Sequence, residues 1–507
     1  MSKRTAIIDI GSNSARLVIF EKTSRYGFHL ICEQKSKVRI GEGAYEKNGH
    51  LQPIGIKRAF LALKSFIHTI DKYQASQTLC VATSALRDAP NAQTFIDWIQ
   101  QELKLSIKVI DGKTEAEYGA IAASNLLPVT DAISIDIGGG SSDIALIKKG
   151  SIVDTYSLNL GTVRLKELFF DKDEKNASIH KKAKAYIQKE LDTLPEHFKA
   201  KLAIGIGGTA RTLSKGIMKR SDYPLDKLHA FSYDLQEHST YLKEIPLTSA
   251  KNLKKFGLKK NRYDTIREGT LIFNEILSHI GAKRVISSSV GVREGVFLKK
   301  LLRGDKQKFP PTINPSIHSI LDRFKPLITI ERKRKAKLKI GSKLYSVLQP
   351  HMKDDKIYEQ ELLYALKLSN IGKTLTIYKA HQHAFYIAMQ ELNYGFSHEQ
   401  ILLISLLLRM YGKGLLHEDL CEKYHTLLPD RQTVSWLSFI YTLTVLLHEA
   451  SNSAQISFEC NNQTLVITSD KPLYLAKEQI KNLEKPIPFA IIIKDESQLP
   501  KNSKLGI

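Results

Sequence analysis

The chain has 507 residues, which is too long for a single hydrophobic core. Its residues are 42% hydrophobic and 25% charged, a composition that excludes a wholly disordered protein. Its 75 lysines and arginines exceed its 52 aspartates and glutamates, which gives a formal net charge of +23. Such an excess favours polyanionic partners: nucleic acid, an acidic membrane or phosphate-rich molecules. A basic surface that only faces solvent fits the same charge.

The cysteine and apolar patterns narrow the cellular context. Cys32, Cys80, Cys421 and Cys460 lie far apart, so neither a disulfide framework nor a zinc ribbon is indicated. Asp9 interrupts the apolar run at the N-terminus, which therefore does not read as a signal peptide. The longest apolar stretch, residues 401–408, is too short to span a bilayer. We expect a soluble, cytoplasmic protein with no membrane partner.

The first 300 residues alternate β-rich runs with helical patterns, which predicts an α/β fold. The predicted strands are residues 6–10, 16–20, 78–82 and 107–110, and the predicted helices are residues 51–73 and 91–103. Charges and three prolines mark residues 303–315 as a linker. Helical periodicity follows from residue 317 to about residue 450. The tail alternates again, and ISFECNNQTLVIT is predicted to be a hairpin that turns at Asn461–Asn462.

Two segments of the α/β part repeat one another. AIIDIGSNSARLVIF begins at Ala6 and ISIDIGGGSSDIALI begins at Ile133, and each joins two apolar strands by a turn of small residues. Such turns let the backbone approach a ligand, and their N–H and hydroxyl groups can cradle phosphate oxygens. We therefore predict that both hairpins grip one phosphate group. The predicted binding residues are Gly11, Ser12, Asn13 and Ser14 in the first turn and Gly138, Gly139, Gly140, Ser141 and Ser142 in the second.

A third glycine-rich turn, in AIGIGGTARTL, adds Gly207, Gly208 and Thr209, because the helix that follows would present its N-terminus to an anion. Arg16 follows Ser14 by two residues, so both point to the same face of their strand. A guanidinium group suits phosphate, although a surface ion pair is the alternative. Asp9 and Asp136 stand at strand ends, where they could hold Mg²⁺ or simply stabilise the turns.

Further motifs follow in order: VATSALRDAPN, VIDGKTEAEYGA, SLNLGTVRLKELFF and SSSVGVREGVFLKKL. With the hairpins, they resemble the exopolyphosphatase/guanosine pentaphosphate phosphohydrolase (Ppx/GppA) family of the actin/Hsp70-like superfamily. The resemblance covers residues 5–302 and implies two ribonuclease-H-like domains, residues 1–124 and 125–303. It also implies an all-α HD-like domain at residues 316–450 and a small α+β cap at residues 451–507.

The same resemblance implies individual roles. Glu115 in DGKTEA would be the catalytic base, with Glu117 as the nearby competitor and a dipole-stabilised helix start as the alternative. Arg87 would contact phosphate. Asp136 and Asp143 would hold Mg²⁺ or another divalent cation, with Asp9 as a further ligand; at Asp143 the family usually has Glu.

The helical region departs from the family pattern. Where many members have a His-Asp pair in a segment like LHDIG, this chain has LSNIG, with Ser369 and Asn370. Neither side chain is a good replacement for that metal-binding pair. We expect a metal-free domain that extends a basic groove or supports a homodimer.

Taken together, these features predict a hydrolase that removes the terminal phosphate of inorganic polyphosphate, of guanosine pentaphosphate (leaving the tetraphosphate), or of both. Two alternatives stay open: an ATP-dependent small-molecule kinase on the same fold, and a non-catalytic sensor of an alarmone or of nucleic acid. For the enzyme itself, we do not expect nucleic acid as a partner.

Overall fold

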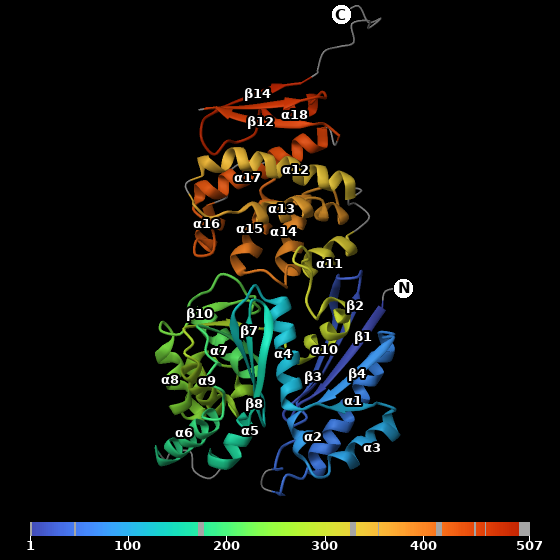
Figure 1. Ribbon diagram of the computed structural model, residues 1–507, viewed down its shortest axis with the longest axis vertical. Helices are drawn as coiled ribbons and strands as arrows, with labels where there is room; N and C mark the ends of the chain where they lie inside the picture. Colours follow the sequence, from blue (N-terminus) through green and yellow to red (C-terminus); the bar gives the residue numbers. More distant parts are fainter. Residues whose placement is uncertain are drawn as a thin grey trace, which may run out of the picture. The chain divides into compact units, whose positions relative to one another are not determined.

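The computed structural model describes residues 3–44, 47–170, 177–324, 331–352, 354–411, 418–450, 453–461 and 463–495. It divides into two compact units (Figure 1). Unit 1 comprises Met1–His318 and Asn393–Ser397, and unit 2 comprises Ser319–Leu392 and His398–Ile507. The division into four domains stays a prediction.

The first sheet of unit 1 has the strand order β3-β2-β1-β4-β5. Its strands are β1 (Lys3–Ile10), β2 (Ala15–Lys22), β3 (Phe28–Ser36), β4 (Gln77–Ala82) and β5 (Ile107–Val109). The first three are antiparallel, and β4 and β5 run parallel to β1. The accompanying helices are α1 (Pro53–Lys72), α2 (Ser84–Asp88) and α3 (Ala92–Leu103). The strands and helices predicted in this region are confirmed to within a few residues.

The second sheet repeats that order, which confirms the internal repeat. It reads β8-β7-β6-β9-β11 with β10 added at the edge, and its members are β6 (Ala132–Ile137), β7 (Ser142–Lys148), β8 (Ser151–Leu158), β9 (Leu202–Ile206), β10 (Ser232–Asp234) and β11 (Arg284–Ser287). The registers of the two hairpins are equivalent: Asp9 pairs with Arg16 in the first, and Asp136 pairs with Asp143 in the second. Each hairpin therefore brings an Asp to the same place at the end of its central strand.

Helices complete the second half of unit 1. They are α5 (Thr162–Leu165), η2 (Lys166–Phe170), α6 (Ala177–Leu191), α7 (Gly207–Arg220), α8 (Ser239–Leu247), η3 (Ala250–Phe256), η4 (Lys260–Arg262), α9 (Ile266–Ile280) and η5 (Arg303–Asp305). Each sheet has its own apolar core, formed with the helices of its half.

Two helices, α4 (Gly112–Leu126) and α10 (Val292–Leu301), lie between the sheets (Figure 1). A third apolar cluster joins them to β1 and β2 through buried residues such as Ile7, Val18, Ile121 and Phe297. Burial of aliphatic and aromatic side chains is the main favourable term in such packing. The outer face of the first hairpin is thereby fixed against both helices.

Unit 1 also contains a segment from much later in the chain. Tyr394 stacks on Phe28 with ring centroids 5.6 Å apart, and the N–H of Gly395 donates to the carbonyl of Leu126 at 2.8 Å. The amide of Asn314 donates to the Tyr394 carbonyl at 3.0 Å. Residues 393–397 are thus part of the packing of unit 1.

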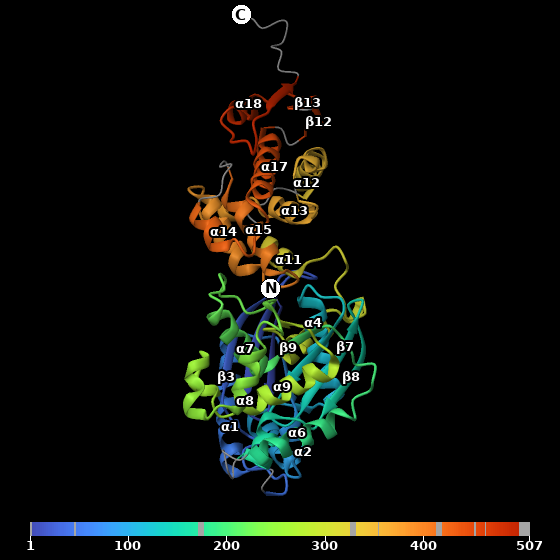
Figure 2. The same cartoon turned by 90° about the vertical axis from the view of Figure 1, so that its left-hand side faces the viewer.

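Helices and a small sheet make up unit 2, while α11 (Pro315–Arg323) spans the division between the units. The other helices are α12 (Glu331–Leu348), α13 (Glu359–Leu368), α14 (Ala380–Glu391), α15 (His398–Arg409), α16 (Glu418–Tyr424), α17 (Arg431–Ala450) and α18 (Tyr474–Ile480). The sheet has the order β12-β13-β14 and consists of β12 (Ile456–Asn461), β13 (Thr464–Ser469) and β14 (Ala490–Lys494). In both views α12 and α17 lie side by side (Figures 1 and 2).

The predicted hairpin in the tail is present, because β12 and β13 pair antiparallel. The expected turn at Asn461–Asn462 cannot be described in full, since residue 462 lies outside the described residues. Likeness of the helices to an HD-type domain stays a prediction. The ammonium group of Lys337, a buried side chain, donates to the hydroxyl of Ser369 at 2.5 Å, so a cationic side chain contacts the LSNIG segment.

Within the described ranges, no helix has both the length and the apolar character that crossing a bilayer requires.

Candidate active site

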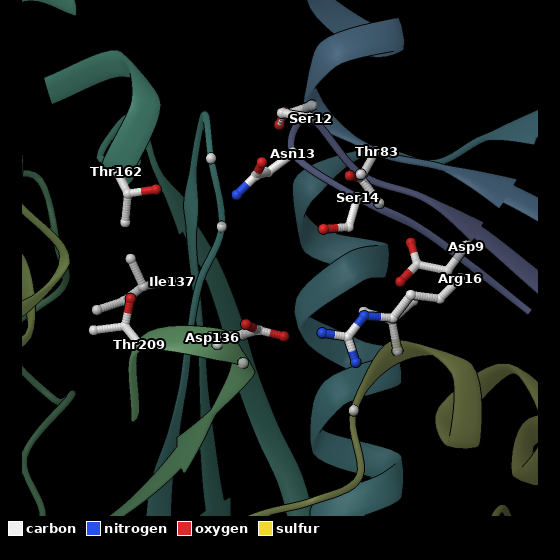
Figure 3. A pocket seen from close by; sticks show the side chains of 18 of the residues that line it. Asp9, Ser12, Asn13, Ser14, Arg16, Thr83, Asp136, Ile137, Thr162 and Thr209 are labelled. Carbon is white, nitrogen blue, oxygen red and sulfur yellow. Dashed lines mark hydrogen bonds between the residues drawn. The ribbon is translucent and has the colours of Figure 1, made fainter. Parts of the chain in front are cut away.

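A cavity of about 150 Å³ lies in unit 1 where the two hairpins approach each other (Figure 3). Most residues predicted for the site line it: Asp9, Gly11, Ser12, Asn13, Ser14, Arg16, Glu115, Asp136, Gly138, Gly139, Ser141, Gly207, Gly208 and Thr209. Arg87, Gly140, Ser142 and Asp143 are not among the lining residues. The structure therefore brings together three turns that are far apart in the sequence.

The two hairpin turns have the same backbone hydrogen bond. The N–H of Gly11 donates to the Ser14 carbonyl at 3.1 Å, and the N–H of Gly138 donates to the Ser141 carbonyl at 2.9 Å. Figure 3 shows Asn13 extending from the first turn toward the second, and the Arg16 guanidinium facing the Asp136 carboxylate across the cavity. Both turns can thus present backbone and side-chain donors to one anion.

The third turn begins α7. Gly207 has a φ of +81°, and a β-carbon added there would lie 2.2 Å from the Asp136 carboxylate oxygen Oδ1. Only glycine fits this position, because both the backbone angle and the space exclude a side chain. The first N–H groups of α7 have no partner within the helix, so its N-terminus suits a bound anion.

Asp9 and Asp136 hold equivalent positions in the two halves, and enclosure raises the pKa of both. Burial raises the pKa of Asp9 from 3.8 to about 6, although Arg293 and Arg16 oppose the shift. Burial likewise raises the pKa of Asp136, against the effect of Arg211. Both carboxylates therefore carry an electrostatic cost that a bound cation would reduce.

Glu115 lies in the first turn of α4, where Asp111 accepts the N–H of Thr114 at 2.7 Å and caps the helix. Arg87 donates to Glu115 Oε2 at 3.2 Å and to the Ile110 carbonyl at 3.0 Å. Burial raises the pKa of Glu115 well above its usual value, Asp143 raises it further, and Arg87 opposes both. The competitor, Glu117, instead pairs with Lys299 at 2.8 Å and does not line the cavity.

Three of the predicted residues outside the lining have identifiable surroundings. Asp143 is buried and accepts the hydroxyl of Ser157 at 2.6 Å, and burial raises its pKa to about 7. Ser142 is also buried, and its hydroxyl donates to the Leu160 carbonyl at 2.5 Å. Arg87 reaches the cavity wall through Glu115 and lies 3.5 Å from the Ser141 hydroxyl.

Several lining residues had not been predicted: Lys35, Thr83, Ser84, Ile137, Thr162, Arg211, Arg262, Thr265, Gly291, Val292 and Arg293. Burial lowers the pKa of Lys35 to about 8 and that of Arg211 to about 10, and neighbouring arginines add to both shifts. Arg211 lies in AIGIGGTARTL and Arg293 in SSSVGVREGVFLKKL, so these motifs could have identified both residues as part of the site. Nothing local marks Lys35 or Arg262, which only the tertiary fold brings to the cavity.

The start of α10 combines a structural and a cavity-lining role. Glu294 accepts the N–H of Gly291 at 2.7 Å, while Arg293 donates to Glu33 at 2.8 Å and lines the cavity. Glu33 also lies 3.8 Å from Arg16. One carboxylate thus contacts two guanidinium groups that face the site.

The carboxylates suit a cation that is shared with a phosphate ligand. In the parts of the chain that the structure describes, no three His, Cys, Asp or Glu side chains are grouped to hold a metal ion by themselves. Mg²⁺, however, is commonly held by one or two carboxylates together with substrate phosphates. Asp9 and Asp136, which line the cavity from the two hairpins, fit such a shared site, whereas Asp143 lies outside the lining and accepts the Ser157 hydroxyl.

The family model of the Ppx/GppA phosphatases matches residues 18–304. The chain belongs to the Ppx/GppA phosphatase family. The two repeated sheets accordingly form the actin/Hsp70-like fold of that family, as the resemblance implied, and the chain is a hydrolase of the exopolyphosphatase family.

Two relatives illustrate the extent of the likeness. Exopolyphosphatase 2 of Mycobacterium tuberculosis is 27% identical over 316 residues, which cover 58% of this chain and 98% of that protein. A bifunctional 3-dehydroquinate synthase/phosphatase of Fusobacterium nucleatum is 33% identical over 303 residues, or 56% of this chain. The chain spans only 44% of the length of the Fusobacterium protein.

Solved structures agree with the sequence comparison. The Aquifex aeolicus member of the Ppx/GppA family is 28% identical, with a TM-score of 0.51, over 60% of this chain and 99% of that one. An exopolyphosphatase from Cytophaga hutchinsonii is 25% identical, with a TM-score of 0.56, over 61% of this chain and its own whole length.

Proposed function

We propose that this Ppx/GppA-family protein hydrolyses the terminal phosphoanhydride of inorganic polyphosphate in the cavity between its two hairpins. One observation carries the proposal: Glu115, an enclosed carboxylate, lines the same cavity as three turns whose donors suit a phosphate group. A phosphate held by the hairpins would face this carboxylate, and a water between them could be oriented for in-line attack.

The reaction balances with the groups at hand. The oxygen of water attacks the terminal phosphorus, the bond from that phosphorus to the bridging oxygen breaks, and Glu115 takes the proton of the water. Burial raises the pKa of Glu115, which makes its carboxylate a stronger base for this transfer. The hairpin N–H groups, the α7 N-terminus and Arg16 stabilise charge on the phosphate oxygens.

Asp9 and Asp136 would hold Mg²⁺ or another divalent cation, which would neutralise phosphate charge when bound, while Asp143, the other predicted ligand, lies outside the cavity lining. Arg87 donates a hydrogen bond to Glu115 but does not line the cavity, so its role is to position the base rather than to contact the phosphate.

Polyphosphate fits the lining better than a nucleotide does. Among the described residues that line the cavity, none is aromatic, and only Ile137 and Val292 have branched apolar side chains, so the cavity offers no aromatic ring on which a base could stack. The Mycobacterium relative is named an exopolyphosphatase. Guanosine pentaphosphate remains the second candidate, because its terminal anhydride could enter the cavity while its base stays outside.

Phosphate release tests the proposal. Wild type, Glu115→Gln and the control Glu117→Gln would be incubated with Mg²⁺ and long-chain polyphosphate, guanosine pentaphosphate or ATP. We expect release from polyphosphate by wild type and by Glu117→Gln, and a loss of about 10²–10⁴-fold in Glu115→Gln. Absence of release from both polyanions by wild type would refute the function. Full activity of Glu115→Gln would refute only the role of Glu115, and turnover of ATP only with an acceptor would indicate a kinase.

A further inference from the structure

Residues 250–262 form a strongly basic stretch of the surface of unit 1, here called the basic segment. It contains Lys251, Lys254, Lys255, Lys259, Lys260 and Arg262, and no acidic residue. All five lysines are exposed. The segment consists of η3, a short connection at residues 257–259, and η4.

The basic segment has a fixed backbone. Leu253, Phe256 and Leu258 are buried in the apolar core of the second half of unit 1. In a 3₁₀ helix, residues three apart share a face, so Leu253 and Phe256 line the buried side of η3 while Lys251 and Lys254 share an outer side. Lys251, Lys254 and Lys255 are therefore held on η3, and the buried Leu258 anchors the connection that carries Lys259 toward η4.

The segment leads into the candidate active site. Arg262, its last residue, lines the cavity, and its guanidinium group lies against Gly208 of the third turn. Lys35 on β3 lines the same cavity. An anion whose end occupies the cavity thus meets Arg262, which Lys259 and Lys260 of the basic segment closely precede in the chain.

The charge of the segment is largely uncompensated within the protein. Among the described residues, no ion pair involves Lys251, Lys254, Lys259 or Lys260, and Lys255 lies 3.8 Å from Glu244, with both side chains more than half exposed. Such a run of like charges repels itself unless an anion binds. Asp264, which lies just beyond the segment, does not compensate this charge, because it pairs with Lys37 at 2.7 Å and with Arg39 at 2.9 Å.

The segment lacks the features that single-stranded nucleic acid requires. Phe256, the only aromatic residue of the segment, is 3% exposed. Proteins that bind single strands without sequence preference combine basic grooves with exposed aromatic rings on which bases stack. An array of lysines without such rings favours a polyanion that has no bases.

We propose that the basic segment binds the distal phosphates of a long polyphosphate chain whose terminal phosphate occupies the cavity. The proposal rests on the proposed function and adds to it a preference for long chains over short ones. Lysine suits this task because each ammonium group acts as a point charge and needs no fixed phosphate geometry.

Steady-state kinetics on long-chain polyphosphate and on tripolyphosphate would test the segment. The variant replaces Lys251, Lys254, Lys259 and Lys260 by Gln, and the matched control replaces four exposed lysines elsewhere in unit 1: Lys57, Lys64, Lys72 and Lys104. We expect KM for the long chain to rise by about tenfold or more in the variant, since four exposed charge contacts are lost. The kcat, the KM for tripolyphosphate and both KM values of the control should change by less than about twofold, and added salt should reduce the difference between variant and wild type.

The outcomes separate the two proposals. An unchanged KM for the long chain, or an equal rise for both substrates, overturns the role of the basic segment and leaves the proposed function standing. If wild type hydrolyses neither substrate, the proposed function fails, and direct binding of labelled long-chain polyphosphate then decides the segment: loss of binding in the variant but not in the control supports it. Equally tight binding of single-stranded DNA that is lost in the same variant would assign the segment to nucleic acid and overturn the proposal.

Discussion

Four carboxyl groups in unit 1 have raised pKa values: Asp9, Glu115, Asp136 and Asp143. Burial is the main cause in each, and mutual repulsion contributes to each except Asp136. Because Asp9 has a pKa of about 6 when folded and 3.8 as its ordinary value, the folded state binds more protons between about pH 4 and pH 6. Its contribution to the free energy of unfolding therefore decreases as pH rises through that window. A bound cation, or the arginines that already lower the pKa values of Asp9 and Asp136, would reduce the electrostatic cost of these enclosed carboxylates.

Substitution of Arg87 tests the proposed base directly, because Arg87 donates a hydrogen bond to Glu115. It lowers the pKa of Glu115, so Arg87→Gln should raise that pKa and leave the base protonated to a higher pH. The acidic limb of the profile of kcat/KM against pH should then move to higher pH by about one unit. Arg58→Gln, which removes a partner of Glu42 away from the cavity, is the control. A limb that stays in place, or that moves to lower pH, would contradict the assignment of Glu115.

Single residues also show what sequence reasoning could and could not reach. The turns were predictable because glycine and serine act locally, and because the second copy repeats the first. Ser142 had been predicted to bind phosphate, but it follows Ser141 directly, and neighbouring residues at a strand point to opposite faces. Ser141 lines the cavity while Ser142 donates to Leu160. Lys35 and Arg262 were missed because only long-range packing brings β3 and η4 to the hairpins.

At the scale of elements, the crossing of α4 and α10 sets the geometry of the site. The start of α4 carries Glu115, and the start of α10 places Val292 and Arg293 on the cavity wall. At Gly295 the helices approach so closely that an added β-carbon would lie 1.9 Å from the Tyr118 carbonyl oxygen. The sequence predicted Glu115 as the catalytic residue, but it did not predict that Val292 and Arg293 line the same cavity, nor how closely α4 and α10 approach.

Gly295→Ala should push α4 and α10 apart. We expect a loss of stability of about 1–3 kcal/mol from overpacking and a fall in kcat/KM, since Glu115 moves with α4. Gly304→Ala is the matched control, because an added β-carbon there meets no atom within 4 Å. Thermal unfolding and phosphate release would be measured on both. A destabilised Gly295→Ala variant with unchanged kcat/KM would show that the crossing does not position the base.

At the scale of the whole molecule, the family match covers residues 18–304, and unit 1 extends beyond it. Residues 393–397 return from the helical part of the chain to pack on Phe28 and Leu126. Residues 303–315, predicted to be a linker, belong to unit 1, where Phe309 is buried, and no local pattern could show that a distant segment rejoins this unit. The HD-like character of the helices and the expected homodimer stay predictions.

The measurement that tests the central claim most directly is the fate of oxygen from water. Tripolyphosphate would be hydrolysed by wild type in water enriched in oxygen-18, and the products would be separated after a few turnovers. If water attacks the terminal phosphorus held between the hairpins, the released orthophosphate carries the label and the remaining pyrophosphate carries none. Label in the pyrophosphate would place the attack at the inner phosphorus and contradict the account.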